Sequence, residues 1–179
     1  MIPTPGLAHL VLTRKADAAI MITASHNPAS DNGIKIFGSN GQKIADEIER
    51  EIERLIESSP EVKSAQQELV AKDENGRNDY ITYLLSTISK SLNGITVVVD
   101  CAHGSASTYA PEVLRRAGAD VIVIGASPDG ENINKDCGST HLDLLATKVL
   151  ESKADLGIAH DGDADRALLI DGDGNVVDG

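Results

Sequence analysis

The second half of the chain alternates between helical and apolar strand patterns, and this alternation constrains the fold more than any other feature. Apolar residues recur at helical spacing over 80–88, 105–118 and 139–153, and short apolar runs typical of buried strands cover 94–100 and 119–125. Gly118 is expected to end the second helix, and Ser139 or Thr140 to cap the third. Strands joined by helices predict right-handed crossovers and parallel pairing. We therefore expect an α/β protein with mixed, mainly parallel sheets flanked by helices.

The first half of the chain has a different order of elements. A turn is expected over 3–6 and a short helix over 7–15, followed by a buried strand over 18–23 (AAIMIT) and an alternating strand over 33–38 (GIKIFG). Over 45–59, isoleucine and leucine recur at helical spacing among many charged residues. That pattern predicts an amphipathic helix whose charged side is a solvated face.

A polar stretch, residues 57–78, separates the two patterns. It contains one proline and one glycine, which predicts a connection between domains. Two consecutive α/β units are therefore expected, one at 1–75 and one at 76–179.

Composition narrows the classes of partner. Aromatic residues make up 2% of the chain, so a stacking platform for single-stranded nucleic acid is not expected. The formal net charge of −12 argues against nucleic acid and anionic membrane as partners, although a bound metal could still attract a small anionic substrate. Two distant cysteines, no evident signal peptide and no apolar run of about 20 residues predict reduced thiols, a cytoplasmic location and no membrane span.

A serine follows the first strand, at a position where ligands bind in α/β proteins. The strand over 18–23 runs into Ser25, His26 and Asn27, and Pro28 then fixes a turn. In such folds the carboxyl ends of strands are the usual ligand-binding positions. Ser25 is therefore a candidate reactive hydroxyl. The alternative is that Ser25 and Asn27 only hydrogen-bond the turn backbone.

The segment HDGDADR, residues 160–166, carries the strongest chemical signal. Asp161, Asp163 and Asp165 are spaced by two residues, which in an extended segment places their side chains on one face. Three crowded carboxylates repel one another unless a cation joins them, and Mg²⁺ or Ca²⁺ is the expected cation. Arg166 adds a forked cation suited to phosphate. The alternative is a solvated acidic turn.

An EF-hand is excluded by position. Counting from Asp161, the sixth residue is Arg166 and the twelfth is Gly172, where that loop needs Gly and Glu. A loop counted from Asp171 has Val176 at its sixth position, so DGDGN at its start is expected to be a plain hairpin turn.

The serine and the acidic segment could act at one metal site. A phosphate on Ser25 would supply an oxygen ligand to the same divalent cation as the three carboxylates. Lys35 and Arg166 could stabilise the charge on the phosphoryl oxygens, and His26 could orient the same group. Lys35 could equally be a surface lysine on an edge strand, and His26 a turn histidine bonded to backbone. The combination predicts phosphoryl transfer at a metal site.

Both motifs resemble those of the α-D-phosphohexomutases. TASHNPASDNGIKIFG, residues 23–38, is similar to the phosphoserine loop of that family, and DGDADR, residues 161–166, is similar to its metal loop. PDGENINKDCGSTHLDLL, residues 128–145, most resembles the phosphoglucosamine mutase branch. The resemblance extends from IPTPG near the first residue to VVDG at the last.

The resemblance implies a magnesium-dependent isomerase acting on glucosamine 6-phosphate and glucosamine 1-phosphate. It implies that Ser25 is phosphorylated, donates its phosphoryl group to form a sugar 1,6-bisphosphate, and takes the other phosphoryl group back. On the same basis, the three aspartates of DGDADR and the Ser25 phosphate would hold Mg²⁺. His26, Lys35 and Arg166 would lie around the phosphoryl group.

Family members have four domains, and the matching motifs cover part of the first and most of the second. The resemblance therefore predicts that these 179 residues bind a divalent ion without turning over sugar phosphate, because the surface that positions the sugar is missing. An incomplete first domain exposes sheet edges, so pairing into a homodimer is a further expectation. His103 stands where many relatives have Asn and is given no catalytic role.

Other functions stay open on the sequence. Within the family, a mannose or glucose phosphate is the alternative substrate, because only residues 128–145 favour glucosamine. Outside the family, a non-catalytic Ca²⁺-binding module would bind the ion with no phosphate on Ser25. A nucleotide-binding domain and a serine hydrolase are disfavoured, because the chain lacks a G-x-G-x-x-G or P-loop lysine after the 94–100 strand and a G-x-S-x-G around Ser25.

Overall fold

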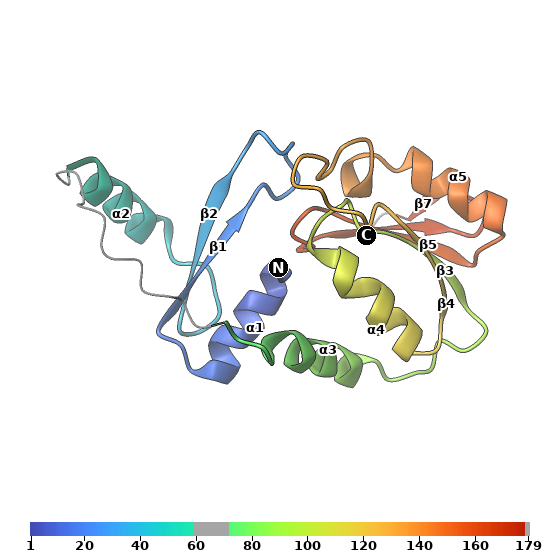
Figure 1. Cartoon of the computed structure of the whole chain (residues 1–179), viewed down its shortest axis with the longest axis horizontal. Coiled ribbons are helices and arrows are strands. Elements are labelled where there is room, and N and C mark those ends of the chain that lie inside the picture. The colour runs from blue at the N-terminus through green and yellow to red at the C-terminus, as the bar shows by residue number, and fades with distance from the viewer. Residues whose placement is uncertain (59–71, 178–179) are drawn as a thin grey trace.

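The computed structural model describes residues 1–58 and 72–177 and contains two α/β units (Figure 1). The first unit consists of α1 (Thr4–Arg14), β1 (Ala18–Thr23), β2 (Gly33–Gly38) and α2 (Asp46–Ser58). The second unit is built on a five-stranded sheet. Its elements in chain order are α3 (Gly76–Thr87), β3 (Thr96–Asp100), a 3-10 helix (Ser105–Thr108), α4 (Ala110–Arg116), β4 (Asp120–Ile124), a second 3-10 helix (Gly138–Thr140), α5 (Asp143–Ser152), β5 (Leu156–His160), β6 (Ala167–Asp171) and β7 (Val176–Val177).

The sheet of the second unit is mixed, with a parallel centre. Its strands are ordered β4-β3-β5-β6-β7, and β3 pairs in parallel with both β4 and β5. These pairings follow from the crossovers through α4 and α5, because a helix carries the chain back to the start of the next parallel strand. The β5–β6 and β6–β7 pairs are antiparallel, and DGDGN forms the predicted turn between β6 and β7. The predicted α/β class with mixed sheets is confirmed.

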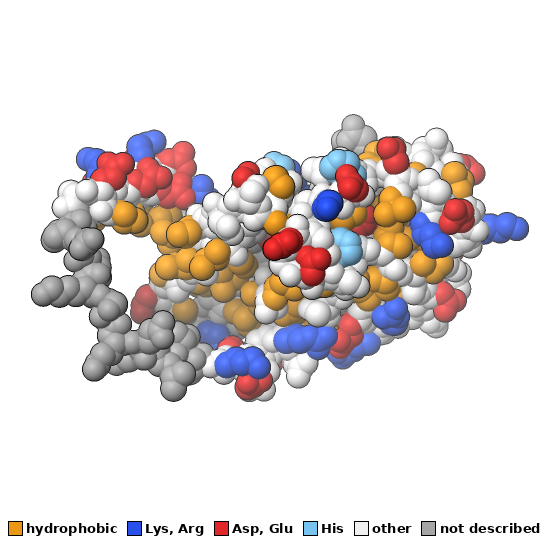
Figure 2. All heavy atoms as spheres, turned by 45° about the horizontal axis from the view of Figure 1, so that its top comes forward, with side chains coloured by type: hydrophobic (Ala, Val, Ile, Leu, Met, Phe, Trp, Pro, Cys, Tyr) orange, Lys and Arg blue, Asp and Glu red, His pale blue; other side chains and the backbone are white. Residues whose placement is uncertain are grey.

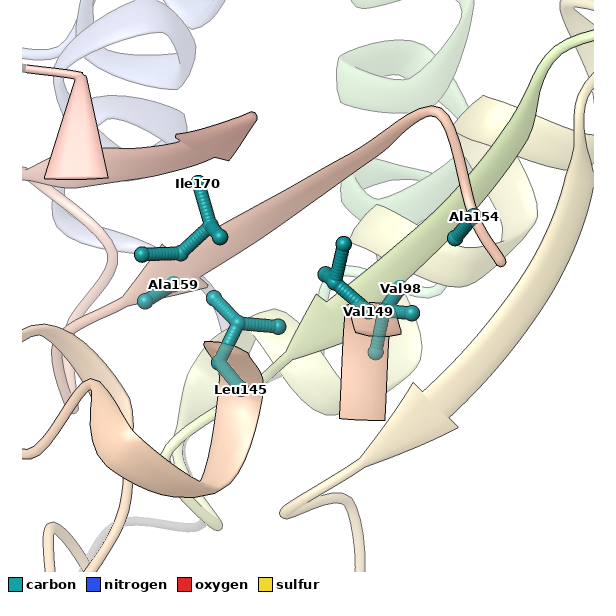
Figure 3. Close-up of a cluster of buried hydrophobic side chains, with 6 residues drawn as sticks. All are labelled: Val98, Leu145, Val149, Ala154, Ala159 and Ile170. Atoms are coloured by element: carbon teal, nitrogen blue, oxygen red, sulfur yellow. The ribbon is translucent and has the colours of Figure 1, made fainter. Parts of the chain in front are cut away.

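Helices cover both faces of the parallel centre. Successive residues of a strand point to opposite faces. Val98 of β3 packs under α5 with Leu145, Val149 and Ile170 (Figure 3). Its neighbour Val99 packs on the other side, against the first 3-10 helix and α4. Because both faces of β3 are buried, its sequence is a continuous apolar run and does not alternate with polar residues.

The hairpin of the first unit buries only one of its faces. β1 pairs antiparallel with β2, and Met21 and Phe37 on one face pack against Val11 of α1. On the other face Ile20 and Ile22 are 62% and 72% exposed, and they join no buried cluster of the described residues. The prediction of a fully buried strand over 18–23 is therefore wrong. A two-stranded sheet covered by one helix buries one residue in two.

The predicted amphipathic helix forms as α2, but its apolar stripe is not buried. Ile48 is 51% exposed and Ile56 is 70% exposed. A hollow of about 720 Å³ lies between this helix and the outer face of the hairpin, lined by Ile22, Ile34 and Ile52 among others. In Figure 2 apolar side chains gather beside the charged face of α2. The charged side of the helix is solvated, as predicted.

Four helix boundaries differ from those predicted. α3 begins at Gly76, four residues before the predicted start at residue 80. α1 begins at Thr4, with Pro3 as its N-cap residue and Pro5 in its first turn. The prolines predicted to form a turn therefore lie at the start of the helix, where a missing N–H is tolerated. The helix predicted over 105–118 is divided between the first 3-10 helix and α4. The N-cap residue of α5 is Leu142, so the predicted cap by Ser139 or Thr140 is wrong, because both residues lie in the second 3-10 helix.

The polar connection predicted over 57–78 lies mainly outside the described residues. α2 runs to Ser58 and α3 begins at Gly76. The domain boundary at 75/76 therefore stays a prediction. No helix within residues 1–58 and 72–177 has the length and apolar character needed to cross a membrane.

The two units contact each other through α1. His9 of α1 stacks on Tyr83 of α3 with ring centroids 4.0 Å apart. At the start of the same helix, the N–H of Thr4 donates to the carbonyl oxygen of Asp163 at 2.9 Å. These contacts place the hairpin beside the carboxyl edge of the five-stranded sheet.

Candidate active site

The acidic turn, Asp161–Arg166, follows β5 at the carboxyl edge of the sheet. Asp161 and Asp163 are buried, Asp165 is more exposed, and one carboxylate oxygen of each lies within 4.8 Å of the other two. The three predicted carboxylates therefore meet. The cause differs from that expected, because the segment is a turn and not an extended strand. Ala164 is left-handed at φ +54°, and its N–H donates to the Asp161 carbonyl at 3.0 Å.

Two cationic side chains contact these carboxylates. Lys35 of β2 donates from Nζ to Oδ2 of Asp163 at 2.6 Å and to Oδ2 of Asp165 at 2.9 Å. Arg166 donates from Nε to Oδ2 of Asp161 at 3.0 Å, and its backbone N–H donates to the other oxygen at 3.2 Å. The Lys35 side chain is 25% exposed, so it is not a freely solvated surface lysine. Its contacts join the hairpin that carries the candidate serine to the acidic turn.

Burial and neighbouring charges shift the pKa values of the aspartates and of Lys35 in different directions. Burial, and then the charges of Asp165 and Asp163, raise the pKa of Asp161. Burial also acts to raise the pKa of Asp165, but the hydrogen bond and charge of Lys35 outweigh it and lower that pKa. Burial alone would lower the pKa of Lys35, whereas its bonds to Asp163 and Asp165 leave it raised. Three carboxylates face two cationic side chains, so the turn keeps excess negative charge that a divalent cation would offset.

Thr4 is a residue of the site that the sequence analysis missed. It is 6% exposed, and its hydroxyl donates to Oδ2 of Asp163. Oδ1 of the same carboxylate is buried and has no hydrogen-bond partner among the described residues. A buried carboxylate oxygen without a partner is costly, and hard cations such as Mg²⁺ favour such ligands. The donor set of the acidic turn therefore fits a magnesium ion.

The loop that carries Ser25 lies against the acidic turn. Ser25 is left-handed at φ +52°, and its N–H donates to Oγ1 of Thr23 at 2.8 Å. Its carbonyl oxygen comes so near Gly162 that a Cβ added to Gly162 would lie 2.5 Å from it. Real Cβ atoms do not approach an oxygen so closely, so glycine at 162 permits the approach. The backbone of Ser25 thus lies beside the residue between Asp161 and Asp163.

His26 is not part of the carboxylate cluster. It is exposed, and across the described ranges 1–58 and 72–177 it has no hydrogen-bond or ion-pair partner, including backbone. It lines a hollow of about 450 Å³ together with Lys135 and His141. The predicted role of His26 at the phosphoryl group therefore stays a prediction.

A buried aspartate organises the neighbouring loops. Asp100, at the end of β3, has no solvent exposure. Its Oδ1 accepts from the N–H of Ala102 at 2.9 Å, and its Oδ2 accepts from the N–H of Gly138 at 2.8 Å. His103, in the loop after β3, also contacts the connection that follows β4, because its Nδ1 accepts from the N–H of Ser127 at 3.1 Å. These contacts hold the loops that follow β3 and β4 at the edge where the acidic turn lies.

Comparison with known proteins identifies the family. Residues 1–63 match the family described as phosphoglucomutase/phosphomannomutase, alpha/beta/alpha domain I, and residues 78–174 match domain II of the same family. The chain belongs to the phosphoglucomutase/phosphomannomutase family. Phosphoglucosamine mutases of Thermobifida fusca and Alcanivorax borkumensis are each 52% identical to this family member, over 100% and 99% of its residues. The chain spans 40% of the length of either relative.

Solved structures of the phosphoglucomutase/phosphomannomutase family share the fold. A family protein from Burkholderia thailandensis matches 99% of this chain with a TM-score of 0.79 and 26% identity, and 40% of that protein is covered. N-acetylphosphoglucosamine mutase of Aspergillus fumigatus, solved in complex with GlcNAc-6P and magnesium, matches 97% of this chain with a TM-score of 0.52. That match covers 48% of the fungal chain at 20% identity, so it shows the fold alone.

Proposed function

We propose that this chain is part of a phosphoglucosamine mutase, an isomerase that interconverts glucosamine 6-phosphate and glucosamine 1-phosphate. Residues 1–75 belong to its first domain and residues 76–179 form its second. The relatives are longer, since the chain spans 40% of their length. The surfaces that bind the rest of the sugar phosphate therefore lie in the longer protein, and these residues alone do not complete the reaction.

Ser25 carries the phosphoryl group in the proposed reaction. The group passes from Oγ of Ser25 to the free hydroxyl of the sugar phosphate. The new P–O bond to the sugar forms as the P–Oγ bond of Ser25 breaks, and the proton lost by the sugar hydroxyl is balanced by the proton that Oγ of Ser25 takes up. The sugar 1,6-bisphosphate then reorients and returns its other phosphoryl group to Oγ. The Ser25 backbone lies beside Gly162, so this exchange takes place next to the acidic turn.

The charged side chains around the turn hold and stabilise the transferred group. The three aspartates and an oxygen of phosphorylated Ser25 are the proposed ligands of Mg²⁺, which when bound neutralises and polarises the phosphoryl group. Lys35 and Arg166 direct positive charge at the oxygens where negative charge accumulates in transfer. His26, next to Ser25, is proposed to orient the group from the exposed side.

The contact between Lys35 and Asp163, 2.6 Å long, carries the proposal. It joins the serine hairpin to the acidic turn, whereas a non-catalytic cation-binding module would need no lysine from that hairpin. The buried oxygen Oδ1 of Asp163, which has no hydrogen-bond partner among the described residues, supports a hard divalent cation such as Mg²⁺. Identity of 52% to phosphoglucosamine mutases, against 26% to the Burkholderia phosphoglucomutase/phosphomannomutase family protein, favours glucosamine over mannose or glucose.

We also propose a cytoplasmic location and no membrane or nucleic acid partner. The net charge of −12 supports the absence of nucleic acid and anionic lipid partners. Cys101 and Cys137 are buried free thiols, which suits a reducing compartment. The outer edge of β1 pairs with no strand of the described residues, which supports pairing of two copies into a homodimer.

Phosphopeptide mapping and a turnover assay test the function. Mapping of the chain as purified is expected to place phosphate on Ser25. In the longer protein that contains this chain, Ser25→Ala is expected to abolish conversion of glucosamine 6-phosphate. Ser30→Ala is the control, because Ser30 is exposed on the same loop. Full turnover by the Ser25→Ala variant would overturn the mechanism. Ca²⁺ binding with no phosphate on Ser25, in the chain or in the longer protein, would favour the non-catalytic module.

A further inference from the structure

Asn134 connects the second unit to the loop that carries Ser25. Its side chain amide nitrogen Nδ2 donates to the carbonyl oxygens of both Ser25 and Asn27, each at 2.8 Å. Asn134 is 7% exposed, and its own N–H donates to the carbonyl of Ala102 at 2.9 Å. The residue is therefore held from the sheet side and reaches across to the hairpin side.

The chemistry of these bonds is specific to an amide side chain. Asn134 has a left-handed backbone at φ +57°, a conformation that asparagine adopts more readily than most residues. An amide NH₂ has two protons to donate, and here the two acceptors are the two carbonyl oxygens. Aspartate would fit the same space but, when ionised, would offer no donor and would face those oxygens with negative charge.

Asn132, on the same loop, forms its side-chain hydrogen bonds within the loop. Nδ2 of Asn132 donates to the carbonyl oxygen of Ser127 at 2.9 Å, and Oδ1 of Asn132 accepts from the N–H of Asp129 at 3.1 Å. Ile133, between the two asparagines, packs so near Gly162 that a Cβ there would lie 2.6 Å from its Cδ1. The loop therefore contacts both the Ser25 segment and the acidic turn, with Asn134 supplying the hydrogen bonds to the Ser25 segment.

We propose that Asn134 is a positioning residue that fixes the Ser25 backbone against the acidic turn. Its role is to let the side-chain oxygen of Ser25 and the carboxylates of the turn act on one cation, and in this it rests on the proposed function. Hydrogen bonds to two carbonyls within three residues restrict both translation and rotation of that segment. Such restriction matters in group transfer, where a displacement of about 1 Å can lower a rate about 100-fold.

Two variants test the hydrogen-bond donors of the Asn134 side chain separately from its backbone conformation. Asn134→Gly removes the side chain while a left-handed backbone stays accessible, and Asn134→Asp keeps the shape but removes the donors. Asn132→Ala is the matched control, because its lost bonds are those within the loop. Hydrogen exchange of the four backbone amides in residues 24–28 of the chain is the first measurement, since Pro28 has no N–H. Both Asn134 variants are expected to exchange about tenfold faster there than the control.

A double-mutant cycle on Mn²⁺ affinity distinguishes a positioning role of Asn134 from a merely structural one. Ser25→Asp adds a fourth carboxylate beside the turn and is expected to tighten Mn²⁺ binding about tenfold. In the Asn134→Gly background the same substitution is expected to tighten it less than about threefold, because the fourth ligand is no longer held in place. In the Asn132→Ala background the gain is expected to stay near tenfold.

The outcomes distinguish this proposal from the proposed function. An unchanged gain from Ser25→Asp in the Asn134→Gly background, or unchanged exchange of residues 24–28, would overturn the positioning role. If Ser25→Asp tightens Mn²⁺ binding in no background, the shared cation of the proposed function fails. Exchange of residues 24–28 then still decides whether Asn134 holds the Ser25 segment.

Discussion

Lys35→Met removes the ammonium group that lies between Asp163 and Asp165, and it should have opposite effects on folding and on metal binding. Without metal, this ammonium forms an ion pair with the carboxylate of Asp163, whose side chain is 3% exposed. With metal, the same ammonium competes with the ion, because it occupies Oδ2 of Asp163 and Oδ2 of Asp165. The variant is therefore expected to be less stable in EDTA and to bind a divalent ion more tightly.

The size of the stability change follows from the burial of the two contacts. A hydrogen bond to a buried charged group contributes about 1.5–3 kcal/mol. The Asp165 contact is about a third exposed, so solvent screens it and it adds less than about 1 kcal/mol. Methionine keeps most of the apolar stem of lysine, which limits the packing loss. The expected loss is about 2–3 kcal/mol, or roughly 5–10 °C in melting temperature for a chain of this length.

Chemical unfolding in EDTA and in saturating Mn²⁺, combined with calorimetric titration of Mn²⁺, measures both effects. A tenfold gain in affinity corresponds to about 1.4 kcal/mol, so the stability deficit in Mn²⁺ should be smaller than in EDTA by that amount. Lys43→Met is the control. Lys43 Nζ lies 3.0 Å from Glu49, but its side chain is 52% exposed. Its removal is expected to change stability by less than about 1 kcal/mol and to leave Mn²⁺ affinity unchanged.

Two results for Lys35→Met would each contradict one of its expected effects. Equal unfolding midpoints for Lys35→Met and the unmodified chain in EDTA would refute the stabilising role. Weaker Mn²⁺ binding by the variant would refute the competition between the ammonium and the ion.

Two further predictions concern buried groups. Thr4→Val keeps the size of the side chain but removes the hydroxyl that donates to Asp163, so unfolding in EDTA should show a loss of about 1.5–3 kcal/mol, most of it restored by Thr4→Ser. An equally stable Thr4→Val would mean that the bond contributes nothing. Burial raises the pKa of Cys101 to about 12 and that of Cys137 to about 11, so few thiolates form at pH 8. A disulfide reagent should therefore label both thiols of the denatured chain, and it should label neither thiol of the folded chain within minutes. Rapid labelling of the folded chain would show that the thiols are not buried.

Local spacing was enough to predict most secondary elements and the acidic triplet. The apolar runs of β3 and β4 and the helical spacing of α2 are patterns that extend over a few neighbouring residues, and such patterns report backbone geometry directly. The helix starts were predicted less well. Pro3 and Pro5 suit both a turn and the first turn of a helix, and the cap of α5 depends on where the preceding loop passes.

The local sequence pattern could not predict which face of the β1–β2 hairpin is buried. The first five residues of AAIMIT are apolar, and a run of this kind is typical of a strand covered on both faces. Whether a face is covered depends on which elements pack there, so Met21 is buried while Ile22 beside it is 72% exposed.

The sequence by itself determined which chemistry is available: a serine after a strand, three carboxylates in five residues, and a nearby arginine. Only the tertiary structure decided which groups share a site. Lys35 and Thr4 reach Asp163 across 128 and 159 positions, and Asn134 reaches Ser25 across 109. Contacts at such separations leave no periodic trace in the residues between them, because they arise from the packing of α1 on the second unit and from the close approach that Gly162 permits.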